Sequence, residues 1–287
     1  MQWSTAMAYA FILVWGAAWG SFLNVVIYRL PAGQSVVHPR SRCPACQTAI
    51  SWWQNIPVLG FALLAGRCGH CKTSISFRYP AVETVTAALC LAVSMPWLLG
   101  LLHGELDAGQ ALAGAASEQY FILALIAIAL IDADTFMIPD VLSLPLPLLG
   151  IAVGLWLGDV RGVSWQQAAS GALLAGALLL AVQFGYAALS GREGLGTGDV
   201  KLLAGLGAWL GIQSLPIVLL LAALQGICFA LGLLLVRRDQ LTEDRGLASL
   251  RHLALPFGPF LALAGIEWLL LHRHAQPLLE SWLNWGM

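Results

Sequence analysis

The stretch LLAGLGAWLGIQSLPIVLLLAALQGICFALGLLLV, residues 202–236, decides the fold class because its 35 consecutive residues carry no charge. A helix needs about 20 mostly apolar residues to cross the hydrocarbon core of a bilayer, so this stretch is too long for one span. Glycine and proline interrupt it at 211–216, where we expect a break. The stretch therefore predicts two membrane spans, the first of them short.

The whole chain has the same apolar character. Of its 287 residues, 59% are hydrophobic and 10% are charged, and the mean hydropathy is +0.79. Soluble domains carry about a quarter charged residues, so this composition excludes an ordinary soluble enzyme, a disordered protein and a disulfide-rich secreted module. The net charge of −1 provides no overall field that would recruit nucleic acid, and no nucleic-acid partner is expected.

Further stretches free of Asp, Glu, Lys and Arg predict an all-α polytopic membrane protein with about eight transmembrane helices. The expected spans are 7–27, 84–102, 119–131, 141–158, one within 162–191, two within 202–236, and 253–272. Residues 1–27 lack the basic start of a cleaved signal and are predicted to form a retained first helix. Residues 108–118 are expected to form an outer loop. The tail 276–287, with Trp282 and Trp285, is expected to form an interfacial helix.

Lysine and arginine residues indicate the orientation of the chain. With the N-terminus outside, the four inner segments hold six, zero, two and four of the 14 basic residues, and the outer segments hold only Arg161 and Arg273. This bias predicts that both termini face the periplasm, if the membrane is a bacterial inner membrane. Residues 28–80, the only sizeable extramembrane region, then form a cytoplasmic loop between the first two helices.

This loop contains Cys43-Pro-Ala-Cys46 and Cys68-Gly-His-Cys71, two pairs separated by 21 residues. Each pair can present two thiolates from one tight turn. Two such turns complete a zinc-ribbon-like tetrahedral site with no open position, which is the structural kind of zinc site. The reducing side disfavours disulfide or redox pairs, which are the alternative. Cys90 and Cys228 lie in spans and are expected to be small buried hydrophobic residues.

Acidic residues in or beside membrane spans are costly and are candidates for function. Asp132 and Asp134 end the third span, and Asp199 starts the sixth, after Gly196 and Gly198. The predicted topology places both points at the cytoplasmic end of the bundle. Two adjacent carboxylates that share one proton can activate water and polarise a carbonyl. The glycines would allow φ values closed to other residues and the approach of an extended peptide. Helix capping, interfacial placement and an ion pathway are the alternatives.

The motifs in order resemble the type IV prepilin peptidases, which process type IV pilins and type II secretion pseudopilins. The resemblance rests on Gly20-Ser-Phe-Leu-Asn-Val-Val-Ile-Tyr-Arg-Leu-Pro31, Ser41-Arg-Cys-Pro44, Asn55-Ile-Pro-Val-Leu59, Gly66-Arg-Cys68, Arg78-Tyr-Pro-Ala-Val-Glu83, Ile131-Asp-Ala-Asp134, Ile138-Pro-Asp140, the GxGD turn at 196–199, Lys201-Leu-Leu203, Leu206-Gly-Ala-Trp-Leu-Gly211 and Pro256-Phe-Gly-Pro259. It implies an aspartic endopeptidase whose catalytic pair falls on Asp132 and Asp199. Gly196, Gly198, Asp134 and Lys201 would support this pair. Cleavage would follow a short basic leader ending in Gly, at the cytoplasmic face.

The resemblance also implies a second activity, which is N-methylation of the new N-terminal residue with S-adenosylmethionine. This activity is associated with the cytoplasmic cysteine loop. Glu83 is the candidate residue for binding the donor or the substrate amine, and a helix N-terminal carboxylate is the alternative. The implied organisation is a first helix at 1–27, a zinc-binding, methyltransferase-associated loop at 28–80, a peptidase bundle at 81–275 and the tail at 276–287. Prepilins or pseudopilins and membrane lipid are the expected partners, and the sequence is compatible with a homodimer.

Three other hypotheses compete with this one. A peptidase without methylation would use the same aspartates. A transporter or channel would use Asp132, Asp134 and Asp199 as an ion relay, and it predicts an internal repeat with helices broken at mid-membrane, which the sequence does not show. A non-enzymatic assembly factor, whose zinc loop docks pilus machinery, is the only hypothesis that tolerates loss of either aspartate.

Overall fold

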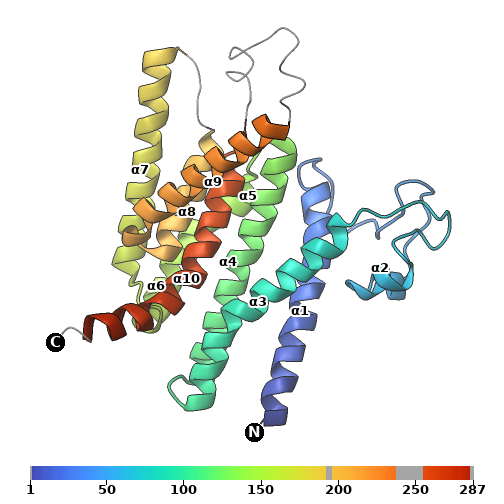
Figure 1. Cartoon of the computed structure of the whole chain (residues 1–287), viewed down its shortest axis with the longest axis horizontal. Coiled ribbons are helices and arrows are strands. Elements are labelled where there is room, and N and C mark those ends of the chain that lie inside the picture. The colour runs from blue at the N-terminus through green and yellow to red at the C-terminus, as the bar shows by residue number, and fades with distance from the viewer. Residues whose placement is uncertain (1, 192–195, 237–254, 285–287) are drawn as a thin grey trace. The chain divides into compact units, whose positions relative to one another are not determined.

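A computed structural model describes the backbone of residues 2–191, 196–236 and 255–284 and the side chains of residues 5–191, 196–235 and 255–272. Within these ranges the chain forms helices and no β-strand, which confirms the all-α prediction (Figure 1). The chain divides into two compact units, Met1–Ala127 and Ile128–Met287. Each unit is described by itself.

The first unit holds the N-terminal helices and the cysteine loop. Its elements are α1 (Gln2–Arg29), η1 (Trp52–Asn55), α2 (Leu59–Leu63), α3 (Arg78–His103) and the beginning of α4 (Ala108–Thr135). Because α4 starts at Ala108, the predicted outer loop at 108–118 is wrong. Glu118 suggested that loop because it is charged, but its side chain is fully buried and has an interaction partner. A buried acid with a partner does not have to end a helix.

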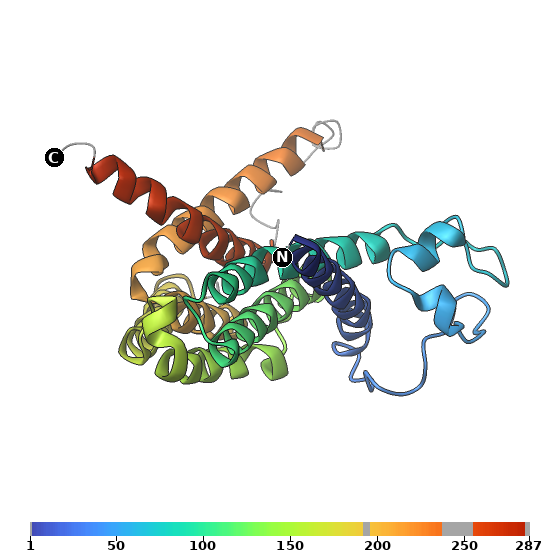
Figure 2. The same ribbon diagram turned by 90° about the horizontal axis from the view of Figure 1, so that it is seen from below.

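Helices α1 and α3 lie side by side in this unit, as Figures 1 and 2 both show. Their close approach depends on two glycines of α1. A Cβ atom added at Gly20 would lie 2.6 Å from Glu83 Cα, and one added at Gly16 would lie 2.8 Å from Ala87 Cα. Glycines four residues apart are typical of membrane helix pairs, since they let two backbones come together.

The second unit is built around the short helix α8. Its elements are the end of α4, α5 (Asp140–Ser143), α6 (Pro145–Arg161), α7 (Trp165–Ser190), α8 (Thr197–Leu210), η2 (Ile212–Ser214), α9 (Leu215–Val236) and α10 (Gly258–Asn284). Helix α8 packs against α6, α7 and α10 and is buried over most of its length. A Cβ atom added at either Gly171 or Gly207 would overlap the carbonyl oxygen of the other, so α7 and α8 are in backbone contact.

The predicted break in the 202–236 stretch is confirmed at Gly211. This residue ends α8 with φ +80° and is followed by η2 and α9. Six described helices are long and apolar enough to cross a membrane. The other two of the eight predicted spans correspond to α8, which has 14 residues, and to the apolar part of α10, Gly258–His272.

Some predictions fall at the edges of the described ranges. The predicted tail helix at 276–287 continues α10 without interruption as far as residue 284, and residues 285–287 lie outside the described part. Of the predicted inner segments, residues 192–195 of 191–201 and all of 237–252 also lie outside it.

Candidate active site and metal site

Asp132 lies in the last turn of α4 and is only 5% exposed. Its Oδ2 atom accepts a hydrogen bond from the backbone N–H of Gly258 at 3.1 Å. Helix α4 ends just beyond it, where Phe136 has φ 56° and donates its N–H to the Asp132 carbonyl at 2.9 Å. Asp134, by contrast, is exposed. Of the two acids at this helix end, Asp132 is therefore the buried one.

Asp199 lies in the first turn of α8, in the same unit as Asp132. Ile138 packs against Gly198, beside Asp199, and against Gly258, whose N–H is bonded to Asp132, so the two turns are neighbours. The Oδ1 atom of Asp199 is buried and has no hydrogen-bond partner among the described residues. The structure thus brings together two acids that are far apart along the chain. Their catalytic role stays a prediction at this point.

Ile138 joins the two turns that carry these aspartates. A Cβ atom added at Gly198 would lie 2.8 Å from Ile138 Cβ. One added at Gly258 would lie 2.6 Å from Asp132 Oδ2 and 3.0 Å from Ile138 Cδ1. Gly198 is thus required by close packing. The expectation that these glycines adopt φ values closed to other residues is wrong, because Gly196 has φ −76° and neither glycine has a positive φ.

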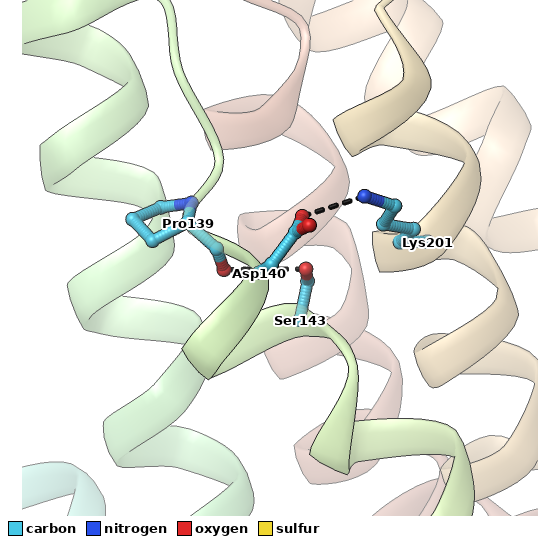
Figure 3. A network of polar contacts seen from close by, with 4 residues as sticks. All are labelled: Pro139, Asp140, Ser143 and Lys201. Atoms are coloured by element: carbon cyan, nitrogen blue, oxygen red, sulfur yellow. Dashed lines mark hydrogen bonds and ion pairs between the residues drawn. The ribbon is translucent and has the colours of Figure 1, made fainter.

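Lys201 connects the same two segments through an ion pair (Figure 3). Its Nζ atom lies 2.6 Å from Oδ1 of Asp140, the first residue of α5. The Ser143 hydroxyl donates to the Pro139 carbonyl at 3.2 Å, which holds the start of this helix. The predicted supporting residue Lys201 therefore contacts the segment that follows Asp132, while it lies on the helix that carries Asp199.

Sequence reasoning gave no role to Gly258 or Ile138, although Gly258 donates its N–H to Asp132 and Ile138 lies against Gly198, the neighbour of Asp199. The only signals were the Pro256-Phe-Gly-Pro259 motif before the last apolar stretch and the Ile138-Pro139 pair. Neither motif contains a side chain with evident chemistry, so neither would be selected without the structure.

The four cysteines of the loop form one cluster, in which all Sγ atoms lie within 4.8 Å of one another. The Sγ atoms of Cys43 and Cys71 are 3.8 Å apart. In a tetrahedral zinc site with Zn–S bonds of about 2.3 Å, neighbouring sulfurs are separated by about 3.8 Å. The donor set and its spacing therefore fit a closed four-thiolate site, and the cluster could bind a metal ion.

The two cysteine turns repeat one local structure. In the second turn, the Cys68 N–H donates to the Thr73 carbonyl at 2.8 Å, and the Thr73 hydroxyl lies 3.3 Å from Cys71 Sγ. In the first turn, the Thr48 hydroxyl lies 3.4 Å from Cys46 Sγ. Hydrogen bonds from Thr73 lower the pKa of Cys71 to about 6, and those from Thr48 lower the pKa of Cys46. Both threonines favour thiolates. Sequence reasoning missed them, although C-x-x-C-x-T occurs twice.

The remaining two cysteines differ from each other. Cys90 is fully buried in α3, as expected. Cys228 is exposed on α9, so the expectation of a buried side chain is wrong there. Helix α9 is apolar on all sides, and hydropathy therefore gives no indication of which face is covered.

Glu83 lies in the second turn of α3 and is 8% exposed. Its Oε2 atom accepts the backbone N–H of Val58 at 2.6 Å. This contact joins the cysteine loop to a membrane helix within the first unit. The predicted role of Glu83 in binding the methyl donor stays a prediction.

Fold and sites together define a polytopic membrane protein with paired aspartates and a four-cysteine cluster. The family model for the bacterial peptidase A24 N-terminal domain matches residues 14–97, and that for the type IV leader peptidase family matches residues 119–231. The protein named prepilin leader peptidase/N-methyltransferase in Burkholderia pseudomallei strain 1026b is 37% identical over 91% of this chain and 84% of that protein.

Two further relatives carry the same name. The protein from Aeromonas hydrophila is 37% identical over 86% of this chain and 84% of its own length, and that from Dichelobacter nodosus is 36% identical over 95% and 94%. No solved structure matches the chain. The chain belongs to the type IV leader peptidase family and is a multi-pass membrane protein.

Proposed function

We propose that this chain removes the leader peptide of type IV prepilins or pseudopilins and then methylates the new N-terminal residue. The observation that carries the proposal is the position of Asp132 and Asp199 on two neighbouring turns of one compact unit, with Ile138 packed against both turns. The names of the relatives support both activities.

The proposed cleavage needs only these two carboxylates and a water molecule. Two acids at hydrogen-bonding distance do not ionise independently, so in the proposed mechanism the pair holds one proton. The ionised carboxylate takes a proton from water, and the protonated one donates a hydrogen bond to the scissile carbonyl. The Gly258 N–H holds the Asp132 side chain in place, while Oδ1 of Asp199 is buried without a hydrogen-bond partner among the described residues.

The test is removal of each carboxylate in turn. Asp132→Asn and Asp199→Asn should each abolish leader removal from a prepilin in membranes, because a neutral amide can neither share a proton nor act as base. Asp134→Asn is the matched control, since this neighbouring acid is exposed, and it should retain cleavage. Cleavage by both of the first two variants would contradict the peptidase proposal. Equal loss with Asp134→Asn would contradict the assignment to Asp132.

We also propose that the four-cysteine cluster holds a structural zinc ion. The metal would cross-link two turns of a loop with little core of its own and so supply folding energy there. Elemental analysis of the purified protein should find about one zinc per chain. Cys46→Ser should lose it. Cys228→Ser should keep it, because Cys228 lies outside the cluster. Zinc retained in full by Cys46→Ser would contradict the proposal.

The proposed location is the bacterial inner membrane, with the aspartates at the cytoplasmic side and both termini in the periplasm. The distribution of the 14 basic residues supports this orientation, because only Arg161 and Arg273 fall on the outer side. Cleavage at the cytoplasmic face agrees with it, since leader sequences of the resembled family are basic and stay on the cytoplasmic side.

The methylation half of the proposal uses S-adenosylmethionine, which would supply the methyl group. The match of residues 14–97 to the N-terminal domain model is compatible with it. Glu83 does not fit the role of a donor ligand, because its carboxylate already accepts the Val58 N–H of the cysteine loop. No methyl-transfer step is therefore assigned to this residue.

A further inference from the structure

The loop segment around Val58 adopts a rare turn. Val58 has φ 61° and ψ −49°, and the N–H of Leu59 donates to the carbonyl of Pro57 at 2.6 Å. These are the features of a classic γ-turn, which is rare and strained. A β-branched residue with positive φ is a genuine backbone outlier. Such a conformation persists only where neighbouring contacts hold it in place.

Glu83 supplies the contact that holds this turn. Its Oε2 atom accepts the Val58 N–H at 2.6 Å, and the Ser21 side chain is a second hydrogen-bond partner of the carboxylate. Hydrogen bonds to a carboxylate are roughly twice as strong as neutral ones. The backbone of Glu83 is itself fixed, because it lies against Gly20 where α1 and α3 are in contact.

The turn is connected to the second cysteine pair through Gln54. A Cβ atom added at Gly60, two residues after Val58, would overlap the Gln54 carbonyl. A Cβ atom added at Gly69, which lies between Cys68 and Cys71, would lie 2.5 Å from Gln54 Nε2. Tight contacts therefore lead from the carboxylate on α3, through the strained turn, to the cysteine cluster.

We propose that Glu83 is a positioning residue that fixes the cysteine loop to α3 by holding the strained turn at Val58, and that it does not bind the methyl donor. The inference rests on the proposed methyltransferase function. The two roles of Glu83 differ in what they require of its side chain. A positioning residue needs only a hydrogen-bond acceptor, whereas a residue that binds a sulfonium or an amine needs the negative charge.

Four variants of the full-length protein in lipid nanodiscs separate the two roles. Glu83→Gln keeps an acceptor for Val58 and a polar partner for Ser21 but removes the charge. Glu83→Ala removes both the hydrogen-bond acceptor and the charge. Val58→Gly relieves the turn, because glycine adopts positive φ without strain. The double variant Glu83→Ala with Val58→Gly asks whether an unstrained turn still needs its holder. Glu105→Ala is the matched control, since this glutamate is exposed.

Two readouts are measured on each protein. Hydrogen–deuterium exchange of residues 54–64 reports on the turn and needs no activity. The kcat and the KM for S-adenosylmethionine, measured with an already cleaved pilin substrate, report on methylation. Leader cleavage of intact substrate, measured in parallel, shows whether each variant is folded.

Glu83→Ala should raise exchange of residues 54–64 and lower the methylation kcat about tenfold or more, the size expected for loss of a hydrogen bond to a charged group. The KM for the donor should stay within about twofold, since no donor contact is removed. Glu83→Gln should resemble the unmodified protein, and the double variant should recover at least part of the lost kcat.

The inference is overturned if Glu83→Gln loses methylation as fully as Glu83→Ala while exchange of the turn is unchanged, since the charge would then be what matters. It is also overturned if the double variant Glu83→Ala with Val58→Gly recovers none of the methylation kcat that Glu83→Ala loses. Absence of methylation by the unmodified protein would refute the proposed function instead, and the exchange measurement would still decide whether Glu83 holds the turn.

Discussion

Removing the ion pair between Lys201 and Asp140 should reduce leader cleavage more than it reduces stability. The pair joins the segment that follows Asp132 to the helix that carries Asp199 (Figure 3). The variants are Asp140→Asn, Lys201→Met and the combination of both. Asp159→Asn, at an exposed acid near the end of α6, is the matched control.

The expected magnitudes follow from the exposure of the pair. Its atoms are 2.6 Å apart, but the side chains of Lys201 and Asp140 are 31% and 60% exposed. A pair this open to solvent contributes about 0.2–1 kcal/mol to the free energy of unfolding. Positioning is more sensitive, because a displacement of about 1 Å between reacting groups can cost about 100-fold in rate. We therefore expect kcat/KM for cleavage to fall about 10- to 100-fold.

The assay is a double-mutant cycle on cleavage of a prepilin peptide in nanodiscs, with thermal unfolding of each protein measured beside it. Once either partner is gone, the second substitution has no pair left to break. The double variant should therefore cleave the peptide no more slowly than the less active of the two single variants. Losses that multiply, or a drop in stability large enough to account for the lost activity, would refute the positioning argument. A change in leader cleavage by the control variant Asp159→Asn would also refute it.

Two other predictions concern the first unit. Gly20→Ala should destabilise the protein by about 1–3 kcal/mol, because the new methyl group would meet the backbone of Glu83. Gly185→Ala, where an added Cβ meets nothing within 4 Å, should leave the unfolding temperature unchanged or slightly raised, and an equal loss at both glycines would contradict the packing argument. Thr73→Val should weaken zinc binding about 10- to 100-fold in competition with a chelator, because Cys71 loses a hydrogen bond to its thiolate, and unchanged affinity would show that this hydroxyl has no part in the site.

The sequence predicts the helices well because a membrane span must be apolar over its whole length. It fails at a helix end when a charged residue is buried with a partner, as Glu118 shows. It also fails on which face of a helix is covered, as Cys228 shows. Burial within a bundle depends on neighbouring helices, and a uniformly apolar helix such as α9 has no periodicity that would identify its neighbours.

In the candidate sites, too, the sequence predicts some features and not others. Cysteine spacing predicted one cluster because two tight turns with paired thiols have few other uses. The roles of Gly258 and Ile138 could not be predicted, because their contribution is a backbone N–H and a methyl contact. The strained turn at Val58 was equally hidden, since valine in a sequence gives no signal for positive φ.

The two sites belong to different units, and we expect the two activities to depend on each other in one direction only. Methylation of a precursor should require cleavage, whereas cleavage should not require the cysteine cluster. The cysteine cluster and Glu83 belong to Met1–Ala127, and both aspartates belong to Ile128–Met287. Loss of zinc in Cys46→Ser should therefore abolish methylation while leader cleavage continues, because the proposed cleavage needs only the two carboxylates and a water molecule. The converse does not hold. Methylation requires a free N-terminal amine, so Asp199→Asn should block methylation of an intact precursor and permit methylation of a substrate that is already cleaved. If Cys46→Ser, still folded, lost cleavage as completely as Asp199→Asn does, the two chemistries would not be separable, and the cysteine loop would have to be counted as part of the peptidase.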